Sequence, residues 1–581
     1  MAIAGFLSEF PSVTAEEWES AIRSSVTGSD YAAKLIWHPE EGLGVRPYYR
    51  AEDIADFPFL KASPGEFPYV RGARATGDWR IREEIDAADP ERANRLAMEA
   101  VAAGAEEISF CGVGSPSQAD VALMLVNLDG IPVRFSGLSQ KSALNVAEQL
   151  RARTHSSKVS ADIDPLADIA FSAELLGSPG PDWKMFTISA EEYEEKGLGA
   201  SEQIAFALSA AVEYLDAMLQ GGVSIGRACG ALGFSFATGP QFFLEIAKLR
   251  AFRLVWAEVV ESFGGNHENA KAVIYGRTAN WNETIYDPQN NVLRATTATI
   301  SAVLGGVDSF SVAPFDACYR LPDEASRRLA RNLQLILKGE AGLARVADAL
   351  GGAYLIEVLT NAIASKAWKL FQELEAAGGY RKAQDDGVIA SIAERRAGDR
   401  DRQAAHRRLV LTGTNQFANA REKAPEGVGS CRQSGRERVA SSFEEIRLRT
   451  ERAGANGRLP RILLAQFGDA KMRSARAQFA ADFLACAGLS ADTRRFENAQ
   501  AVAESDADLI VLCSSDAEYA EFAEAVMPGL EGRGRRVPVV VAGNPADADR
   551  LKDLGIAEFI HLRSDAVETL KRLQHLMGIE D

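Results

Sequence analysis

The chain has 581 residues, of which 46% are hydrophobic and 25% charged, and its formal net charge at pH 7 is −17. This length exceeds what one hydrophobic core supports, so at least two domains are expected. The composition is ordinary for a globular protein, and the acidic balance argues against nucleic acid or an anionic membrane as the main partner.

The sequence contains no apolar run long enough to span a bilayer, and its first ten residues carry no basic group, so no membrane span and no secretory signal are expected. The six cysteines are widely spaced and form no Cys-x-x-Cys pair. We therefore expect reduced thiols in a cytoplasmic protein.

The first segment, residues 1–60, is predicted to be a helical and extended arm that contacts another subunit. Thr14 suits a helix N-cap, and Glu17 lies three residues later, where a capping-box partner belongs. The rest of the segment has no strong period. It carries aromatic side chains, among them Trp18 and Trp37, which argue against free solvation.

Residues 61–384 alternate short apolar runs with helical patterns. Eight of the runs are expected to be strands, at residues 78–85, 107–113, 132–137, 159–164, 183–189, 234–239, 272–278 and 309–315. Strands that alternate with helices in this way predict an α/β fold, a closed (β/α)8 barrel of the TIM type with parallel strands.

Residues 385–459 are rich in arginine and poor in apolar residues. A basic run can bind nucleic acid, but here acidic residues are interleaved and aromatic residues are nearly absent. The segment is therefore predicted to be a charged linker wrapped on the surface.

The last segment, residues 460–581, has the pattern of a flavodoxin-like α/β domain. Buried-type strands are expected at residues 461–467, 508–515, 538–543 and 558–563, with helices between them. In such sheets, ligands bind outside the carboxyl ends of the strands. The expected loop at 468–475, GDAKMRSA, lies there but contains no histidine and no phosphate-cradling run of glycines.

Several long stretches resemble the cobalamin-dependent methylmalonyl-CoA mutase family. They are FPYVRG at 67–72, FALSAAVEYLDAM at 206–218, AKLRAFRLVWAEVV at 247–260, YDPQNNVLRATTATISAVLGGVDSF at 286–310 and nearly all of 329–379. The resemblance implies a barrel threaded by the coenzyme A arm and a C-terminal cobalamin domain. It also implies an isomerase in which adenosylcobalamin generates the radical that interconverts methylmalonyl-CoA and succinyl-CoA.

The family's cobalt-binding motif is absent from the last segment. Catalytic members carry Asp-x-His-x-x-Gly there, with the histidine below the cobalt and the aspartate orienting its imidazole. Ala470, Met472 and Ala475 stand at these positions. The cobalamin-binding domain is thus expected to be degenerate.

The family's barrel motifs are also changed. Glu192 stands where catalytic members place a histidine that binds the thioester carbonyl, and Tyr275 replaces a second histidine. The family's Gln-Asn-Asp becomes Asp162, Ile163 and Asp164, and a tyrosine expected between FPYVRG and the first strand is missing. A carboxylate at the thioester would repel the developing negative charge.

The histidines support this interpretation without any alignment, because none follows the strands at 183–189, 272–278 or 461–467. The six are His38, His155, His267, His406, His561 and His575. Cys513 ends a strand of the last segment with no histidine near it to activate it.

This pattern resembles the small, or beta, subunit of heterodimeric bacterial mutases. The resemblance implies a non-catalytic chain that pairs with the large, or alpha, subunit, while adenosylcobalamin is bound by that partner. It implies no catalytic, cofactor-binding or metal-binding residue in this chain, and a GTPase chaperone as a further possible partner.

Two alternatives remain open from the sequence. One is a divergent acyl-CoA mutase with its own activity, for which Glu192, Tyr193, Asp162 and Arg277 would be the polar candidates. The other is a regulator without turnover. Such a regulator would bind either coenzyme A esters or a GTPase chaperone that associates with the mutase.

Overall fold

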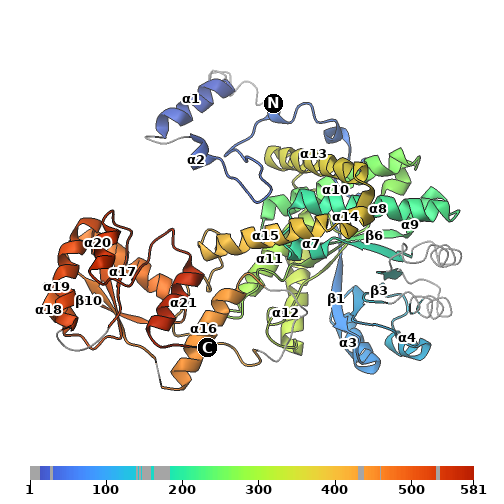
Figure 1. Ribbon diagram of the computed structural model, residues 1–581. Helices are drawn as coiled ribbons and strands as arrows, with labels where there is room; N and C mark the ends of the chain where they lie inside the picture. Colours follow the sequence, from blue (N-terminus) through green and yellow to red (C-terminus); the bar gives the residue numbers. More distant parts are fainter. Residues whose placement is uncertain are drawn as a thin grey trace.

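The computed structural model describes residues 13–26, 31–138, 142, 146, 159–162, 183–428, 438–457, 459–531 and 537–580. Figure 1 shows an N-terminal arm, a barrel surrounded by helices, and a smaller sheet domain to which α15 and α16 lead. None of the described helices is both long and apolar enough to cross a membrane.

The barrel has eight parallel strands in the order β4-β3-β2-β1-β8-β7-β6-β5. They are β1 (Arg80–Asp86), β2 (Glu107–Cys111), β3 (Val133–Phe135), β4 (Val159–Ala161), β5 (Phe186–Ser189), β6 (Leu232–Thr238), β7 (Ile274–Thr278) and β8 (Ser309–Ser311). A bridge between Ser160 and Lys184 joins β4 to β5, and the Ala161 N–H donates to the Lys184 carbonyl at 2.8 Å. The expected barrel is confirmed, and each strand overlaps its predicted run, although β1 ends one residue later and β6 begins two residues earlier than predicted.

Helices pack around the barrel. They are α3 (Pro90–Ala102), α4 (Gln118–Met124), α7 (Glu191–Glu195), α8 (Ala200–Gln220), α9 (Ile225–Ala231), α10 (Phe242–Ser262), α11 (Asn290–Leu304), α12 (Glu324–Leu335), α13 (Tyr354–Ala376) and α14 (Gly379–Asp385). The hydrophobic α10 is buried on most sides because α8 and α13 cover it, and its Phe252 and Trp256 lie edge-on to Phe234 of β6, at 4.5 and 4.9 Å. This layer forms the main core of the chain.

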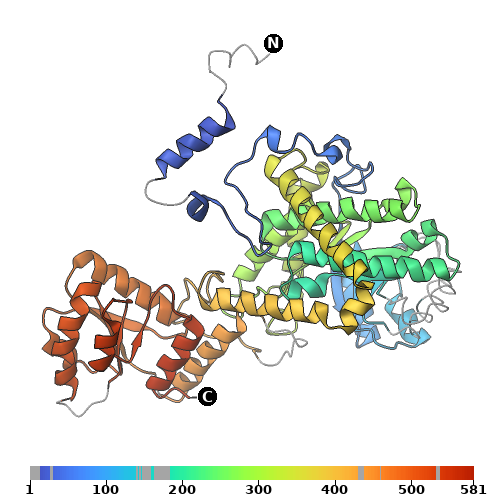
Figure 2. The same ribbon diagram turned by 45° about the horizontal axis from the view of Figure 1, so that its top comes forward.

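The arm consists of α1 (Ala15–Ser25), α2 (Tyr31–Leu35) and an extended stretch. Thr14 caps α1 as predicted, and the Glu17 carboxylate accepts the Thr14 N–H at 2.8 Å. Neither helix has a buried residue, and Figure 2 shows α1 apart from the barrel helices. The extended stretch is attached, because the buried Glu41 carboxylate accepts the Ser201 hydroxyl of α8 at 2.6 Å.

The region expected to be a charged linker contains two helices, α15 (Val388–Ala405) and α16 (Ser441–Ala455). Arg396 of α15 donates to the Glu202 carboxylate at 2.8 Å, and Arg400 lies 3.6 Å from the centre of the Trp281 ring. On α16, Phe443 and other apolar residues belong to the core of the small domain. Several arginines of this region, including Arg396 and Arg400, thus bind partners within the chain.

The small domain has five parallel strands in the flavodoxin-like order β10-β9-β11-β12-β13. They are β9 (Ile462–Gln466), β10 (Ala491–Arg495), β11 (Leu509–Cys513), β12 (Val539–Val541) and β13 (Glu558–Phe559). The helices are α17 (Ala470–Ala485), α18 (Ala499–Ala503), α19 (Tyr519–Glu531), α20 (Ala548–Asp553) and α21 (Ala566–Leu576). The expected fold class is confirmed, although β10 was not predicted, because this edge strand is exposed and charged.

Candidate functional site

The barrel axis is occupied by three large side chains. Arg82 of β1, Arg134 of β3 and Tyr275 of β7 are each at most 5% exposed. The Arg134 guanidinium lies 4.8 Å from the centre of the Tyr275 ring, and that of Arg82 lies 5.8 Å from it. Because β3 and β7 are not neighbours in the sheet, this contact crosses the interior. Gly233 gives the ring room, since a Cβ there would lie 2.8 Å from it.

The charges in this interior are paired with one another. Arg134 Nη2 donates to both carboxylate oxygens of Asp162, at 2.9 and 3.1 Å, and its Nη1 reaches the Ser235 hydroxyl at 3.4 Å. Burial raises the pKa of the Asp162 carboxyl, although Arg134 opposes that shift. Arg82 donates to the Gly276 carbonyl at 2.8 Å. The bond from Arg134 of β3 to Ser235 of β6 crosses the barrel, whereas the Arg134–Asp162 pair lies between the neighbouring strands β3 and β4.

A second group of charges closes the carboxyl end of the barrel. Arg277 of β7 donates to Glu191 at 2.7 Å and to Glu195 at 2.9 Å, and the Ser235 hydroxyl also donates to Glu191. Burial disfavours the charge of Glu191, but Arg277 and Arg134 outweigh this effect and lower its pKa to about 2. Arg277 thus holds two carboxylates at the carboxyl end of the barrel, beside a cavity of about 240 Å³ that it helps to line.

The four polar candidates from the sequence do not form one site. Asp162 and Arg277 lie in the ion pairs just described. Contrary to expectation, the Glu192 side chain is 54% exposed and pairs with Lys196 at 3.5 Å. Tyr193 is buried away from the axis, where its hydroxyl lies 2.8 Å from that of Tyr380 on α14. Ile163, Asp164 and His155 lie outside the described residues.

The residue that enters the mouth is Glu191, which sequence reasoning missed. Helix α7 begins at Glu191, so Glu191 and Glu195 share one face and Glu192 points away from it. The sequence EEYEE contains acidic residues four positions apart, which share one face of a helix. Which of them face the barrel could be predicted only if the first residue of the helix were known.

Among the described residues, no histidine lies at the contact between Arg82, Arg134 and Tyr275. Burial raises the pKa of the Tyr275 hydroxyl to about 12, so it stays protonated at neutral pH. His267, which precedes β7, stacks on Phe67 with ring centres 4.0 Å apart. The arginines cannot act as bases because they stay charged.

The second candidate position is the carboxyl end of β9 in the small domain. The segment 468–475 is not the loop that we expected, because α17 begins at Ala470. The Asp469 carboxylate caps this helix by accepting the Met472 N–H at 2.8 Å. Ala470 and Ala475 are exposed, and Met472 is half-buried in the first turn. The connection between β9 and α17 thus consists of three residues, Phe467, Gly468 and Asp469.

Glu518 holds this short connection in place. Its carboxylate accepts the Ser514 and Ser515 hydroxyls at 2.5 and 2.6 Å and the Asp469 N–H at 3.2 Å. The two serine bonds lower the pKa of Glu518 to about 2. A Cβ on Gly468, which has φ +64°, would lie 2.3 Å from this carboxylate. The serines of CSSDAEY therefore hold the chain's own glutamate.

The residues at this edge do not fit a corrin that is ligated by imidazole. His561 ends β13, three strands from β9 and so about 14 Å away, and its Nδ1 accepts the Arg563 N–H at 3.1 Å. Cys513 is fully buried, and burial raises its pKa to about 12. The described residues contain no cluster of histidine, cysteine and carboxylate side chains that could hold a metal ion.

Comparison with known proteins gives extensive matches. A family model described as methylmalonyl-CoA mutase matches residues 38–115 and 138–481. The chain is 33% identical to a methylmalonyl-CoA mutase small subunit from Porphyromonas gingivalis, over 98% of each chain, and 33% identical to one from Streptomyces virginiae, also over 98% of each. It is 30% identical to a methylmalonyl-CoA mutase from Rhizobium meliloti, over 70% of this chain and 64% of that protein.

Proposed function

This chain belongs to the methylmalonyl-CoA mutase family, and on that premise we propose that it is a non-catalytic small subunit. It pairs with a large catalytic subunit, which binds adenosylcobalamin and interconverts methylmalonyl-CoA and succinyl-CoA, and it stabilises that subunit. The chain is similar to small subunits along almost its whole length. In this proposal it binds neither cobalamin nor substrate.

The observation that carries the proposal is the filled barrel axis. A coenzyme A arm that threads the barrel would have to displace Arg134 and Tyr275, which lie against each other across the interior. Moving Arg134 away would leave the Asp162 carboxylate without its bidentate partner. Breaking a buried ion pair from one side costs several kcal/mol, about 3–5. This cost would reduce the net binding free energy of a coenzyme A ester.

The small domain supports the same conclusion from a different direction. A corrin needs space and a ligand at the end of β9, where this chain places a capped helix and the Glu518 carboxylate. Phe467 stacks on Phe522 beside them, with ring centres 3.5 Å apart. The chain's own side chains take the place of a ligand.

The arm is the part of the chain that we assign to contact with the large subunit. An isolated helix as short as α1, with no buried side chain, gains little stability without packing. Trp18 is 50% exposed and Trp37 is 42% exposed. Exposed aromatic residues on a separate element are typical interface anchors. We propose that the large subunit covers them.

The test is to express this chain with and without the large subunit. We expect a one-to-one complex, no mutase turnover by this chain alone, and no binding of methylmalonyl-CoA to it by calorimetry. Trp18→Ala should weaken the complex about tenfold or more, since aromatic anchors often contribute over 1 kcal/mol. Phe417→Ala, at an aromatic residue that is 69% exposed outside the arm, is the matched control and should leave it unchanged.

Two results would refute the proposal. One is turnover of methylmalonyl-CoA by this chain with adenosylcobalamin and no large subunit. The other is a stable homodimer that does not associate with the large subunit at all.

A further inference from the structure

A cavity of about 470 Å³ lies beside the C-terminal half of α15. Arg396, Arg400, Arg402 and Arg408 line it from α15 and the turn that follows, and Arg563 lines it from the residues after β13. Five arginines thus surround one hollow in a chain whose net charge is −17. We call it the arginine cavity.

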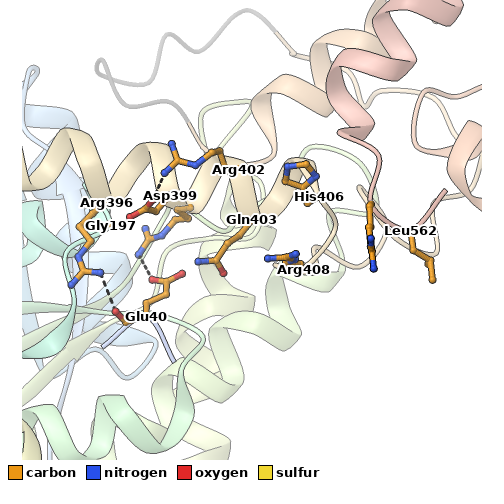
Figure 3. Close-up of a pocket in the computed structure, with 11 residues that line it drawn as sticks. Glu40, Gly197, Arg396, Asp399, Arg402, Gln403, His406, Arg408 and Leu562 are labelled. Atoms are coloured by element: carbon orange, nitrogen blue, oxygen red, sulfur yellow. Dashed lines mark hydrogen bonds and ion pairs between the residues drawn. The ribbon is translucent and has the colours of Figure 1, made fainter. Parts of the chain in front are cut away.

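Part of this positive charge is offset inside the chain. Arg396 binds the Glu202 carboxylate, Arg402 is paired with Asp399, and Arg400 lies 3.6 Å from the Glu40 carboxylate. Figure 3 shows Arg402 beside Asp399 and Arg396 beside Glu40, toward one side of the cavity. The lining carboxylates are therefore already engaged.

The remaining donors have no partner within the described part of the chain. The side chains of Gln403, His406 and Arg408 make no hydrogen bond or ion pair there, and in Figure 3 Gln403 and Arg408 lie next to each other beneath His406. The Arg563 side chain is likewise unpaired among those residues. On the floor, Arg400 is 5% exposed, and its buried Nε has no hydrogen-bond partner among them.

We propose that the arginine cavity binds a small molecule that carries a chain of phosphates, as an inorganic polyphosphate or as the phosphate part of a nucleotide. Guanidinium groups bind phosphate oxygens through paired, charge-assisted hydrogen bonds, and several of them converge here. The volume lies within the range of small-molecule sites. This inference is independent of the proposed subunit role.

One feature of the site opposes an anion, namely the C-terminal end of α15. Its exposed carbonyl groups carry partial negative charge, but this effect is weaker than a single charge-assisted hydrogen bond to arginine. Because neither Arg408 nor Arg563 has a side-chain partner among the described residues, the guanidinium groups outweigh the dipole. The exposed Leu562 at the rim offers an apolar contact that a nucleoside could use and an inorganic phosphate could not.

The site also joins two parts of the chain. Arg408 follows α15, which packs on the barrel helices, whereas Arg563 belongs to the small domain. A ligand that contacts both would therefore bridge the two parts and stabilise the folded chain by mass action.

The experiment is calorimetric titration of the purified full-length chain, or of the complex in which it is isolated, with sodium tripolyphosphate and separately with ATP. We expect saturable binding of tripolyphosphate that weakens as salt is added. Arg408→Ala and Arg563→Ala should each weaken it about tenfold, the usual effect of losing a charge-assisted bond. Tighter binding of ATP, lost in Leu562→Ser, would identify the nucleotide as the source of the phosphates.

The control is Arg494→Ala, which removes an exposed arginine of β10 outside the cavity and should leave the affinity unchanged. Circular dichroism and thermal unfolding of each variant separate lost binding from lost folding. Absence of saturable binding at low salt would overturn the proposal, and so would equal losses in the control. Tighter binding of a poly-glutamate peptide than of tripolyphosphate would also overturn it, in favour of a protein partner.

Discussion

The barrel axis and the edge of the small sheet occupy equivalent places, since each lies where parallel β-strands commonly position ligands. This chain fills the two in different ways. The axis holds buried arginines that are paired with carboxylates of nearby strands and strand ends. The edge is held by a helix cap and by serine hydroxyls on a partly exposed glutamate. Removing one partner from the buried ion pairs of the axis should therefore destabilise the protein strongly. Removing one hydrogen bond at the edge of the small sheet should cost little.

The pKa values of two glutamates express the same difference. Burial raises the pKa of Glu283, near the barrel mouth, to about 8. The hydroxyls of Ser514 and Ser515 lower that of Glu518, at the small sheet, to about 2. The two regions should therefore lose stability in opposite pH windows.

The largest expected effect comes from breaking the ion pairs of the barrel axis. Arg134→Ala leaves Asp162 without its main partner, so the free energy of unfolding should fall by about 3–4 kcal/mol. Urea unfolding followed by tryptophan fluorescence measures the loss. Arg494→Ala, at an exposed arginine, should cost less than about 0.5 kcal/mol. A loss at Arg134 as small as this control would show that the axis is not sealed by paired charges.

The next effect is a pH dependence at Glu283, whose Oε2 has no hydrogen-bond partner among the described residues. Its folded pKa of about 8 exceeds the ordinary value of 4.5. The folded state therefore holds a proton that the unfolded state has released, so stability falls as pH rises between these values. Glu283→Gln removes this titration. At about pH 8 it should be more stable than the parent by about 2 kcal/mol, and the gain should vanish near pH 5.

Urea midpoints of both chains across this range measure the difference. Glu497→Gln, at an exposed acid of the small domain, is the matched control and should run parallel to the parent. A constant offset for Glu283→Gln at every pH would contradict the raised pKa.

A smaller effect is expected at the cap of α17. Asp469→Ala removes the acceptor of the Met472 N–H, which should cost about 1 kcal/mol of small-domain stability. Hydrogen exchange at the first turn of α17 locates the change. Asp492→Ala on β10, an exposed acid outside the cap, should leave that exchange as it was. Unchanged protection in Asp469→Ala would mean that the first turn is held by other contacts.

The smallest effect belongs to Glu518. Its pKa is lowered, so its contribution to stability is present above the ordinary value of 4.5 and is lost as pH falls toward about 2. Because solvent screens this partly exposed group, Glu518→Gln should cost no more than about 1 kcal/mol near neutral pH. The difference from the parent should close below about pH 3. A difference that widened in acid would contradict the assigned direction.

The sequence predicted the fold well because its signals were local. The eight strands of the barrel and four of the five strands of the small sheet followed from apolar runs between helices. Strand β10 was missed, since ADTRR is exposed and carries no apolar run. The start of α17 was missed because the polar run GDAKMRSA was interpreted as a ligand-binding loop after the strand, whereas Asp469 caps a helix that begins at Ala470.

The contacts among the side chains that fill the barrel could not be predicted from the sequence. That Tyr275 replaces a histidine was visible, but its contact with Arg134 joins residues 141 positions apart on strands that are not neighbours. The choice between Glu191 and Glu192 depends on the first residue of α7. Both features depend on the tertiary structure, which the periodicity of apolar residues along the sequence does not reveal.

We propose that this chain provides structure and that a large-subunit partner provides the chemistry. The most direct measurement is the amount of cobalamin per complex, obtained by purifying this chain together with the large subunit, saturating the complex with adenosylcobalamin, desalting it and recording the visible spectrum. The account predicts one cobalamin for each pair of chains. Two for each pair would contradict it.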